Sequence, residues 1–318
     1  MSQELQGELV EKEIEANLAA LPETAELSQF IKEALARTTG RLSVKENKES
    51  RPWLLLPLIV CESVSGEYEP AVPVAAALLL AKAAAELFDD IEDQDTPRAL
   101  YLKWGLPIAT NIATTMLILS EKAIPGLRAR GIPDHKIVHI MDIINSFHGH
   151  TCTGQHRDLS ISPGTVITEE DYLSITGMKS ASQIECACYT GAYLATDDEM
   201  KINAFARFGY NLGMAVQIAN DIKGIVEGID IIKRKTTLPV IYGLTQVEGE
   251  DLSRLTKTYM ANSETTADPV EIKDILFRTG AIYYATVKIE MYKQAAVDAL
   301  SIVKAGGINI QQLKELLD

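Results

Sequence analysis

The sequence has few cysteines, an excess of acidic over basic residues and almost no strand pattern. Four cysteines in 318 residues are too few for a disulfide framework, and their spacing does not match a zinc site. The formal net charge of −14 argues against a nucleic-acid partner, because the phosphates would be repelled. The alternation of apolar and polar residues that is typical of strands is nearly absent. These absences favour an all-α protein with reduced thiols.

The chain also lacks the hydrophobic runs that would predict a signal peptide or a membrane span. No basic N-region followed by an apolar region opens it, so we expect no signal peptide. The longest uncharged stretch, residues 104–120, is too short for a membrane span and indicates a buried helix. We therefore expect a cytoplasmic protein without a membrane span.

Apolar residues recur at helical spacing along most of the chain. In residues 1–40 a break at Pro22 predicts a helical hairpin that packs on the rest of the molecule. Two buried helices are expected before Asp95, and further helices over residues 136–159, 168–195 and 197–223. With no internal repeat and no low-complexity linker, we predict one all-α domain over residues 1–318.

Five acidic residues fall within seven positions at the end of the apolar run 71–85. If the helix continues through them, Asp89 and Asp93 lie on one face at i and i+4, with Asp90 about 100° round. Oxygen-only donors suit a hard cation such as Mg²⁺. The alternative is a solvated acidic helix end, which the helix dipole disfavours.

A second polar cluster lies near the end of the later helix. Asn220 and Glu227 are seven residues apart and would share a helix face, with Gln217 on the same side. Such a helix end, opposite the first acidic cluster, could clamp cations and a diphosphate. Taken alone, Asn220 and Asp221 would also fit a helix C-cap with a local hydrogen bond.

Five short motifs follow one another along the chain in a fixed order. They are Asp89-Asp90-x-x-Asp93, Gly154-Gln155-x-x-Asp158-Leu159, Lys179-Ser180, Gln217-x-x-Asn220-Asp221 and Asp230-x-x-x-x-Lys235-x-x-Leu238-Pro239. In order and spacing they resemble the motifs of the trans-isoprenyl diphosphate synthase superfamily, the class I isoprenoid synthases. The resemblance extends from about Lys48 to the C-terminal region. It implies the isoprenoid synthase fold, a large bundle of long helices around a central active-site cavity.

The resemblance also implies a role for each matching residue. Mg²⁺, three ions with diphosphate bound, would be held by Asp89, Asp90, Asp93, Asn220 and Asp221. An allylic prenyl diphosphate would ionise in an apolar cavity while metals and basic side chains draw the leaving group away. The catalytic set would be Asp89, Asp93, Arg98, Lys179 and Asn220, and Gln155, Asp158, Gln217 and Lys235 would join Arg98 and Lys179 in binding substrate. The family also implies a homodimer.

Departures from the family pattern concern a second diphosphate site, which binds isopentenyl diphosphate in elongating members. Lys48 and Arg51 match its Lys-x-x-Arg, but Glu49 replaces a basic residue. Lys82, seven residues before Asp89, stands where the family has His or Gln and so adds one positive charge to this site. Ala99 replaces the second Arg of a pair, leaving Arg98 alone. The sequence therefore retains only some of the basic residues expected at the isopentenyl diphosphate site.

The second aspartate-rich motif departs as well. Gly224 stands where the family has the last Asp of this motif. Glu227 lies on the same helix face as Asn220 and is therefore a candidate to replace that Asp. The loop from Gly224 to Asp230 is shorter than in elongating synthases. These changes resemble the ComQ-type peptide prenyltransferases and some bacterial terpene synthases.

Three functions remain open from the sequence. The first is a prenyltransferase that transfers the allylic cation to isopentenyl diphosphate or to a non-diphosphate acceptor such as a peptide. The second is a class I terpene synthase that converts a farnesyl- or geranylgeranyl-type diphosphate to a hydrocarbon or alcohol. The third is a non-catalytic subunit, against which the intact first motif argues. Small residues before Asp89 (Ala81, Ala84 and Ala85) indicate either a deep pocket for a long prenyl chain or close helix packing.

Overall fold

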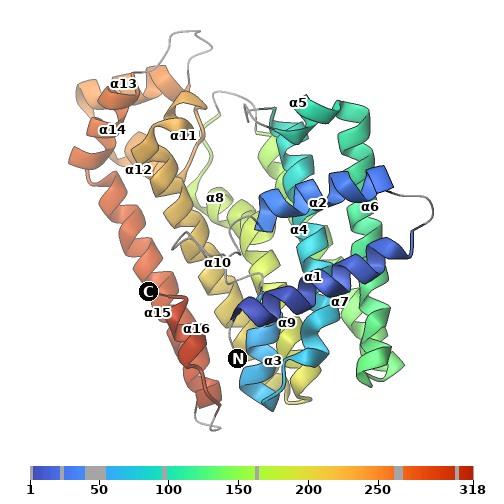
Figure 1. The fold of residues 1–318 in the computed structure, drawn as a ribbon. Coiled ribbons are helices and arrows are strands. Elements are labelled where there is room, and N and C mark those ends of the chain that lie inside the picture. The colour runs from blue at the N-terminus through green and yellow to red at the C-terminus, as the bar shows by residue number, and fades with distance from the viewer. Residues whose placement is uncertain are drawn as a thin grey trace. The chain divides into compact units, whose positions relative to one another are not determined.

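The computed structural model describes residues 3–21, 25–39, 55–94, 99–161, 165–260, 268–304 and 308–317. Within these ranges every regular element is helical and none is a strand, which confirms the all-α prediction. The predicted hairpin, the buried helices before Asp95 and the helices over 136–159 and 197–223 all occur (Figure 1). The expected helix over 168–195 is present with one irregular turn, at Gly177–Ala181.

The chain forms two compact units. Unit 1 comprises residues 1–146, 186–206 and 300–318, and unit 2 comprises residues 147–185 and 207–299. The prediction of one domain around a central cavity stays a prediction. Unit 1 holds α1 (Gln3–Ala19), α2 (Ala25–Thr39), α3 (Leu56–Ser65), η2 (Glu69–Ala71), α4 (Val72–Asp93), α5 (Leu100–Trp104), α6 (Leu106–Ala123), η3 (Ile124–Arg130) and α16 (Gln311–Glu315).

Unit 2 holds α8 (Glu169–Thr176), η4 (Gly177–Ala181), α11 (Ile229–Ile232), α12 (Leu238–Gln246), α13 (Gly249–Tyr259) and α14 (Pro269–Arg278). The limits between the units fall inside α7 (Asp134–Leu159), α9 (Ser182–Ala195), α10 (Glu199–Glu227) and α15 (Ala281–Lys304).

The core of unit 1 is built on α4. A proline in its first turn suits a helix start, and the residues from Val72 to Ala84 are almost all buried. Many of them are alanines, whose small side chains let α4 pack closely on α6. This packing positions the acidic C-terminal end of α4.

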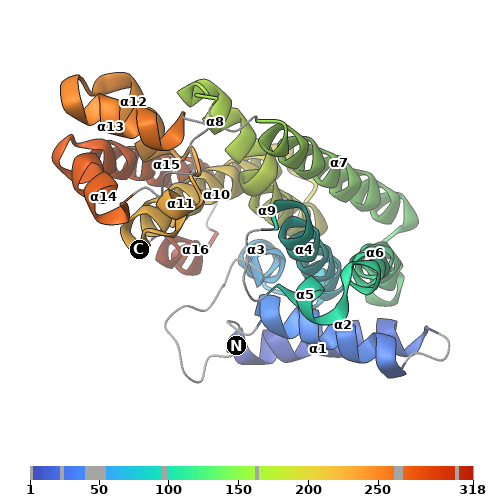
Figure 2. The same cartoon turned by 90° about the horizontal axis from the view of Figure 1, so that it is seen from above.

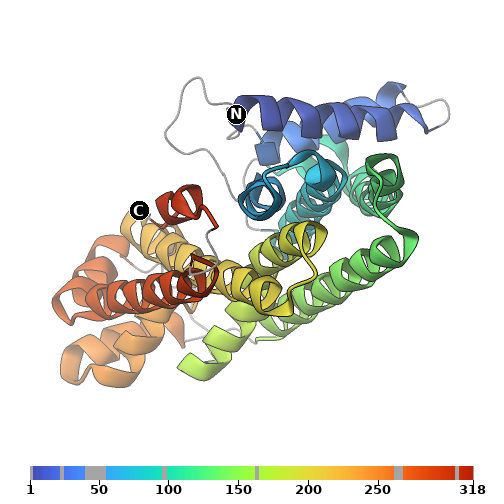
Figure 3. The same cartoon turned by 90° about the horizontal axis from the view of Figure 1, so that it is seen from below.

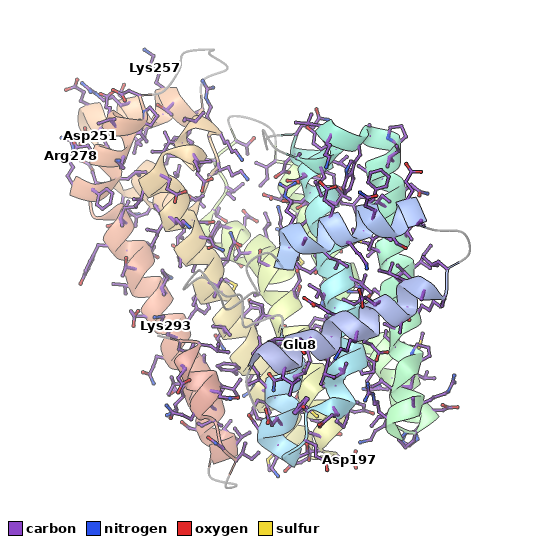
Figure 4. The ribbon with its side chains drawn as sticks, in the orientation of Figure 1. Glu8, Asp197, Asp251, Lys257, Arg278 and Lys293 are labelled. Carbon is purple, nitrogen blue, oxygen red and sulfur yellow. The ribbon has the colours of Figure 1, made fainter. Side chains whose placement is uncertain are left out.

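The N-terminal hairpin packs on α4 and α6. Buried residues of α1 recur at a spacing of four (Val10, Ile14, Leu18), so one face of this helix points into the unit. Glu8 lies on the exposed face (Figure 4). In Figure 3 both helices of the hairpin lie on the side of α4 on which they pack.

Unit 2 contains two apolar clusters. Ile225, Val240, Leu255 and Ile275 belong to the first, which joins α10 to α12, α13 and α14. These three helices lie together in Figure 2, and the surface ion pair of Arg278 with Asp251 links α14 to α13 (Figure 4). The second cluster packs Tyr172 of α8 against α10, α12 and α15.

One described helical stretch, Glu69–Asp93, is long and apolar enough to cross a membrane. In this structure 72% of its most apolar window is buried. That burial is typical of a core helix, and α4 is the core helix of unit 1.

Candidate active site

The first acidic cluster lies on the last turn and a half of α4. The helix continues through Asp89 and Asp90, as predicted, and ends at Asp93; the next residue, Gln94, takes the left-handed conformation with φ 51°. All three aspartates are half-buried. On a continuous helix Asp89 and Asp93 share a face, so their carboxylates are suited to one group of cations.

Asp90 is held by the N-terminal hairpin. Arg37 Nη1 of α2 lies 2.8 Å from Asp90 Oδ2. The neighbouring Thr38 hydroxyl donates a hydrogen bond to Glu86 Oε2 at 2.7 Å. A cavity of about 230 Å³ opens beside these groups and reaches Asp89. The end of α2 therefore forms part of the surroundings of the first motif.

Of the residues expected at the second diphosphate site, one is described. Lys82 lies half-buried on α4, with its Nζ atom 3.7 Å from Glu86 Oε1. Glu86 thus offsets part of the charge of Lys82. Lys48, Arg51 and Arg98 lie outside the described residues.

Lys179 lies on a π-helical turn, Gly177–Ala181, between α8 and α9. Such turns are frequent at functional sites. A Cβ atom on Gly154 of α7 would come within 2.5 Å of the Lys179 backbone nitrogen, so this position admits only glycine. Lys179 Nζ donates to Asp158 Oδ2 at 2.8 Å. The structure therefore brings the Gly154–Leu159 motif of α7 and Lys179 together. Gln155 of this motif is half-buried.

The second motif lies near the C-terminal end of α10. Asn220 is exposed, whereas Asp221 is buried. Tyr172 Oη donates to Asp221 Oδ2 at 2.6 Å, and Gln217 Nε2 donates to Asp221 Oδ1 at 2.8 Å. Ser180, beside Lys179, donates to Gln217 Oε1 at 3.2 Å. A line of hydrogen bonds thus connects the π-helical turn to the buried carboxylate.

Burial raises the pKa of Asp221 to about 6, although the hydrogen bonds from Tyr172 and Gln217 oppose the rise. The charge of Asp230 adds to the rise and that of Lys235 counteracts it. Burial, followed by the charge of Asp221, raises the pKa of Tyr172 well above its usual value. The phenol therefore stays protonated and donates. Both oxygens of Asp221 are engaged within the protein, and a metal-binding role for Asp221 stays a prediction.

Gly224 and Glu227 follow on the same helix. A Cβ atom on Gly224 would overlap the carboxylate of Asp230, so Asp230 occupies the space in which a side chain at position 224 would begin. Glu227 is exposed and lies 3.9 Å from Lys223. Its proposed substitution for the missing aspartate stays a prediction.

Lys235 follows in an exposed turn before α12. Its backbone N–H donates to the Asp230 carbonyl at 2.9 Å. The carboxylate of Asp230 and the ammonium of Lys235 both influence Asp221 electrostatically. This turn therefore belongs to the surroundings of the second motif.

Sequence reasoning missed three residues that contact the motifs. Tyr172 and Arg37 are 49 and 53 positions away from their carboxylate partners, and no local pattern marks either of them. Asp230 could have been noticed, because it is the first residue of the last of the five motifs. Its packing on Gly224 was not predictable, because it requires a bend in the chain after α10. Gly228, with φ 79°, provides that bend.

The donor set at the first motif fits Mg²⁺ in chemistry, because Asp89 and Asp93 offer carboxylate oxygens on one helix face. Within the described part of the chain, no three His, Cys, Asp or Glu side chains are already gathered as a metal site. Mg²⁺ commonly completes its shell with water and substrate phosphates, so a few protein carboxylates suffice.

Comparison with known proteins identifies the family. The sequence profile named Polyprenyl synthetase matches residues 32–276. The chain is 29% identical over 250 residues to the geranylgeranyl diphosphate synthase of Mycobacterium tuberculosis, covering 74% of this chain and 70% of that protein. It is 25% identical over 238 residues to the tryptophan prenyltransferase ComQ of Bacillus subtilis, covering 74% and 76%.

The fold agrees with this match. The crystal structure of the geranylgeranyl pyrophosphate synthase from Corynebacterium glutamicum, complexed with isoprenyl diphosphate and magnesium, superimposes with a TM-score of 0.78 at 18% identity. The match covers 99% of this chain and 96% of that one, which confirms the predicted isoprenoid synthase fold. The chain belongs to the polyprenyl synthetase family and is an enzyme of the prenyltransferase type.

Proposed function

We propose that this enzyme ionises an allylic prenyl diphosphate with the help of Mg²⁺ and transfers the prenyl cation to an acceptor. The observation that carries the proposal is the first motif on a continuous helix end, with Asp89 and Asp93 on one face. Asp89 and Asp93 would hold Mg²⁺, Asn220 with Asp221 would help to hold a further ion, and the ions would neutralise charge on the departing diphosphate. The number of ions follows the family expectation of three.

The basic side chains bind and orient the diphosphate in this proposal. Lys179 supports the role because the π-helical turn and the glycine at position 154 fix its backbone. Lys179 and Lys235 place positive charge where the leaving group gains negative charge, which lowers the barrier for breaking the carbon–oxygen bond. Arg98 has the same role, by its place after the first motif.

The acceptor follows from the residues around Lys82. A diphosphate bound by Lys82 would also meet the carboxylate of Glu86, 3.7 Å from its ammonium group. Glu49, which stands in place of a basic residue, makes the second site less basic as well and favours an acceptor without a diphosphate, and the similarity to a tryptophan prenyltransferase points the same way. Isopentenyl diphosphate is the competing acceptor, which Lys48 and Arg51 would favour.

A terpene synthase activity is the second candidate. Gly224 and the short loop from Gly224 to Asp230 depart from the family pattern and favour it. In that case the cation would cyclise or take up water, and no acceptor would be consumed. The relatives are enzymes, and together with the intact first motif this argues against a non-catalytic subunit.

The test is an incubation of the purified protein with MgCl₂ and farnesyl or geranylgeranyl diphosphate. Parallel samples contain isopentenyl diphosphate, a short tryptophan-containing peptide or no acceptor, and Asp89→Asn serves as the inactive control. A prenylated peptide or an elongated diphosphate identifies the acceptor by mass spectrometry. A hydrocarbon or alcohol without acceptor would establish the terpene synthase instead, and no turnover under any condition would contradict the proposal.

We propose further that the protein is a cytoplasmic homodimer. Apolar side chains on α6 support an interface, because Leu106 and Ile118 are 53% and 60% exposed. Light scattering after size-exclusion chromatography measures the mass. A value near the chain mass of 34.8 kDa would contradict the dimer.

A further inference from the structure

Two consecutive residues at the end of α2 reach two carboxylates on α4. Arg37 lies 2.8 Å from Asp90, and Thr38 donates to Glu86 at 2.7 Å. Residues 86 and 90 are one helical turn apart, so both contacts fall on the same face of α4. Figure 1 shows α2 crossing α4. The hairpin is thus attached beside the first motif by one ion pair and one hydrogen bond.

The ion pair gives Asp90 a different setting from that of its neighbours. The side chain of Asp90 is only 15% exposed and that of Arg37 is 36% exposed. Its Oδ2 atom faces α2, whereas Asp89 and Asp93 share a helix face about 100° away. Arg37 and Asp90 also line the cavity of about 230 Å³ that reaches Asp89. The pair therefore forms a wall of the space next to the first metal-binding carboxylate.

We infer that Arg37 is a positioning residue for the first aspartate motif: it holds Asp90 towards α2 and leaves Asp89 and Asp93 to bind Mg²⁺. The inference rests on the proposed function, in which this motif binds the metal. Arg37 also offsets one of three neighbouring negative charges. The motif then presents two carboxylates to the ions, and Asp90 serves to anchor the helix end.

Loss of Arg37 has a distinct consequence in this arrangement. Asp90 loses its ion pair with α2, its carboxylate is no longer held towards α2, and the local charge becomes more negative by one. Mg²⁺ alone is then attracted more strongly, by roughly tenfold in its dissociation constant. Catalysis suffers, because the extra carboxylate disturbs the arrangement that the diphosphate needs, so kcat falls about tenfold while KM changes little. A merely structural role would weaken metal binding or leave it unchanged.

The experiment is calorimetric titration of the full-length protein with MgCl₂ in the absence of substrate. Arg37→Ala is compared with Arg37→Lys, which keeps the charge, and with Thr38→Val, which breaks only the hydrogen bond to Glu86. Arg37→Ala is expected to bind Mg²⁺ about tenfold more tightly than the wild type, whereas Arg37→Lys and Thr38→Val stay within about twofold. The double variant Arg37→Ala with Asp90→Asn is expected to return to the wild-type value. Thermal unfolding checks that each variant is folded.

The outcomes separate the inference from the proposed function. Equal Mg²⁺ affinities for the wild type and a folded Arg37→Ala variant would overturn the positioning role alone. Equal effects of Arg37→Ala and Thr38→Val would also overturn it, because the hairpin would then act only as a structural support. A wild-type protein that binds no Mg²⁺, with or without inorganic diphosphate, would overturn the proposed function and the inference together.

Discussion

The two aspartate-rich motifs hold their side chains in different ways. In unit 1 the aspartates of α4 are half-buried at a helix end, and Asp90 has an ion pair with Arg37. In unit 2 the carboxyl group of Asp221 is buried and accepts hydrogen bonds from Tyr172 and Gln217. The first motif presents carboxylates at the spacing of its own helix. The buried carboxylate of the second also depends on Tyr172 from α8, so its function is more sensitive to packing.

The largest expected effect is at the first motif. Asp89→Asn removes a charged ligand and is expected to lower kcat by about 10³-fold, with an unchanged melting temperature because the side chain is only half-buried. Steady-state turnover and thermal unfolding measure the two quantities. Asp142→Asn, at an exposed carboxylate of α7 in the same unit, is the matched control and should have full activity. Turnover of Asp89→Asn near the wild-type rate would remove Asp89 from the metal site.

The same contrast explains how much the sequence could predict. Helical spacing placed Asp89 and Asp93 on one face, and the continuous helix up to Asp93 confirms the local part of that prediction. The hydrogen bond from Tyr172 to Asp221 could not be predicted, because Tyr172 lies 49 positions away in the sequence and no motif surrounds Tyr172. The ion pair of Arg37 with Asp90 could not be predicted for the same reason. Spacing along one helix is encoded locally, whereas contacts between helices depend on packing of the whole unit.

The second motif offers a comparison between two acids. Asp230 occupies the space above Gly224, while Glu227 is exposed beside Lys223. If Asp230 supplies the carboxylate that Gly224 lacks, Asp230→Ala raises the Mg²⁺ concentration for half-maximal activity by about tenfold, and Glu227→Ala by less than about twofold. Magnesium titrations of initial rates measure both. The reverse order would restore Glu227 as the substitute.

A positional swap sharpens this test. Gly224→Asp alone should be inactive or unstable, because its side chain would overlap the carboxylate of Asp230. Adding Asp230→Gly makes room and should recover part of the lost activity. No recovery in a folded double variant would show that the two positions are not interchangeable.

Tyr172→Phe is expected to destabilise the protein by about 2 kcal/mol, because it removes a hydrogen bond to a buried carboxylate. Chemical denaturation measures the loss of unfolding free energy. Tyr283→Phe, at a phenol that is 74% exposed, is the matched control and should cost almost nothing. A loss equal to that of the control would mean that Tyr172 contributes nothing to holding Asp221.

The smallest effect concerns a second carboxyl group of unit 2 that burial affects. Glu185 of α9 is half-buried, and no hydrogen bond or ion pair joins it to another described residue. Burial raises the pKa of Glu185 from 4.5 to about 7. The pKa of Tyr210 on α10 is also raised, mainly by burial of the phenol and secondly by the charge of Glu185. Unlike Asp221, Glu185 accepts no hydrogen bond from a described residue that would offset burial.

The sign of the resulting pH dependence follows from linkage. The folded protein binds the proton of Glu185 more tightly than the unfolded chain, so the associated stability is full below pH 4.5 and is lost as the pH rises through about 7. Glu185→Gln should therefore raise the unfolding free energy at pH 8 by about 1 kcal/mol, after allowance for partial exposure, and change it little at pH 4.5. Denaturation at both pH values measures the difference, with the exposed Glu170→Gln as control. An equal effect at both pH values would trace the gain to packing, because an effect of the charge disappears once the carboxyl group is protonated.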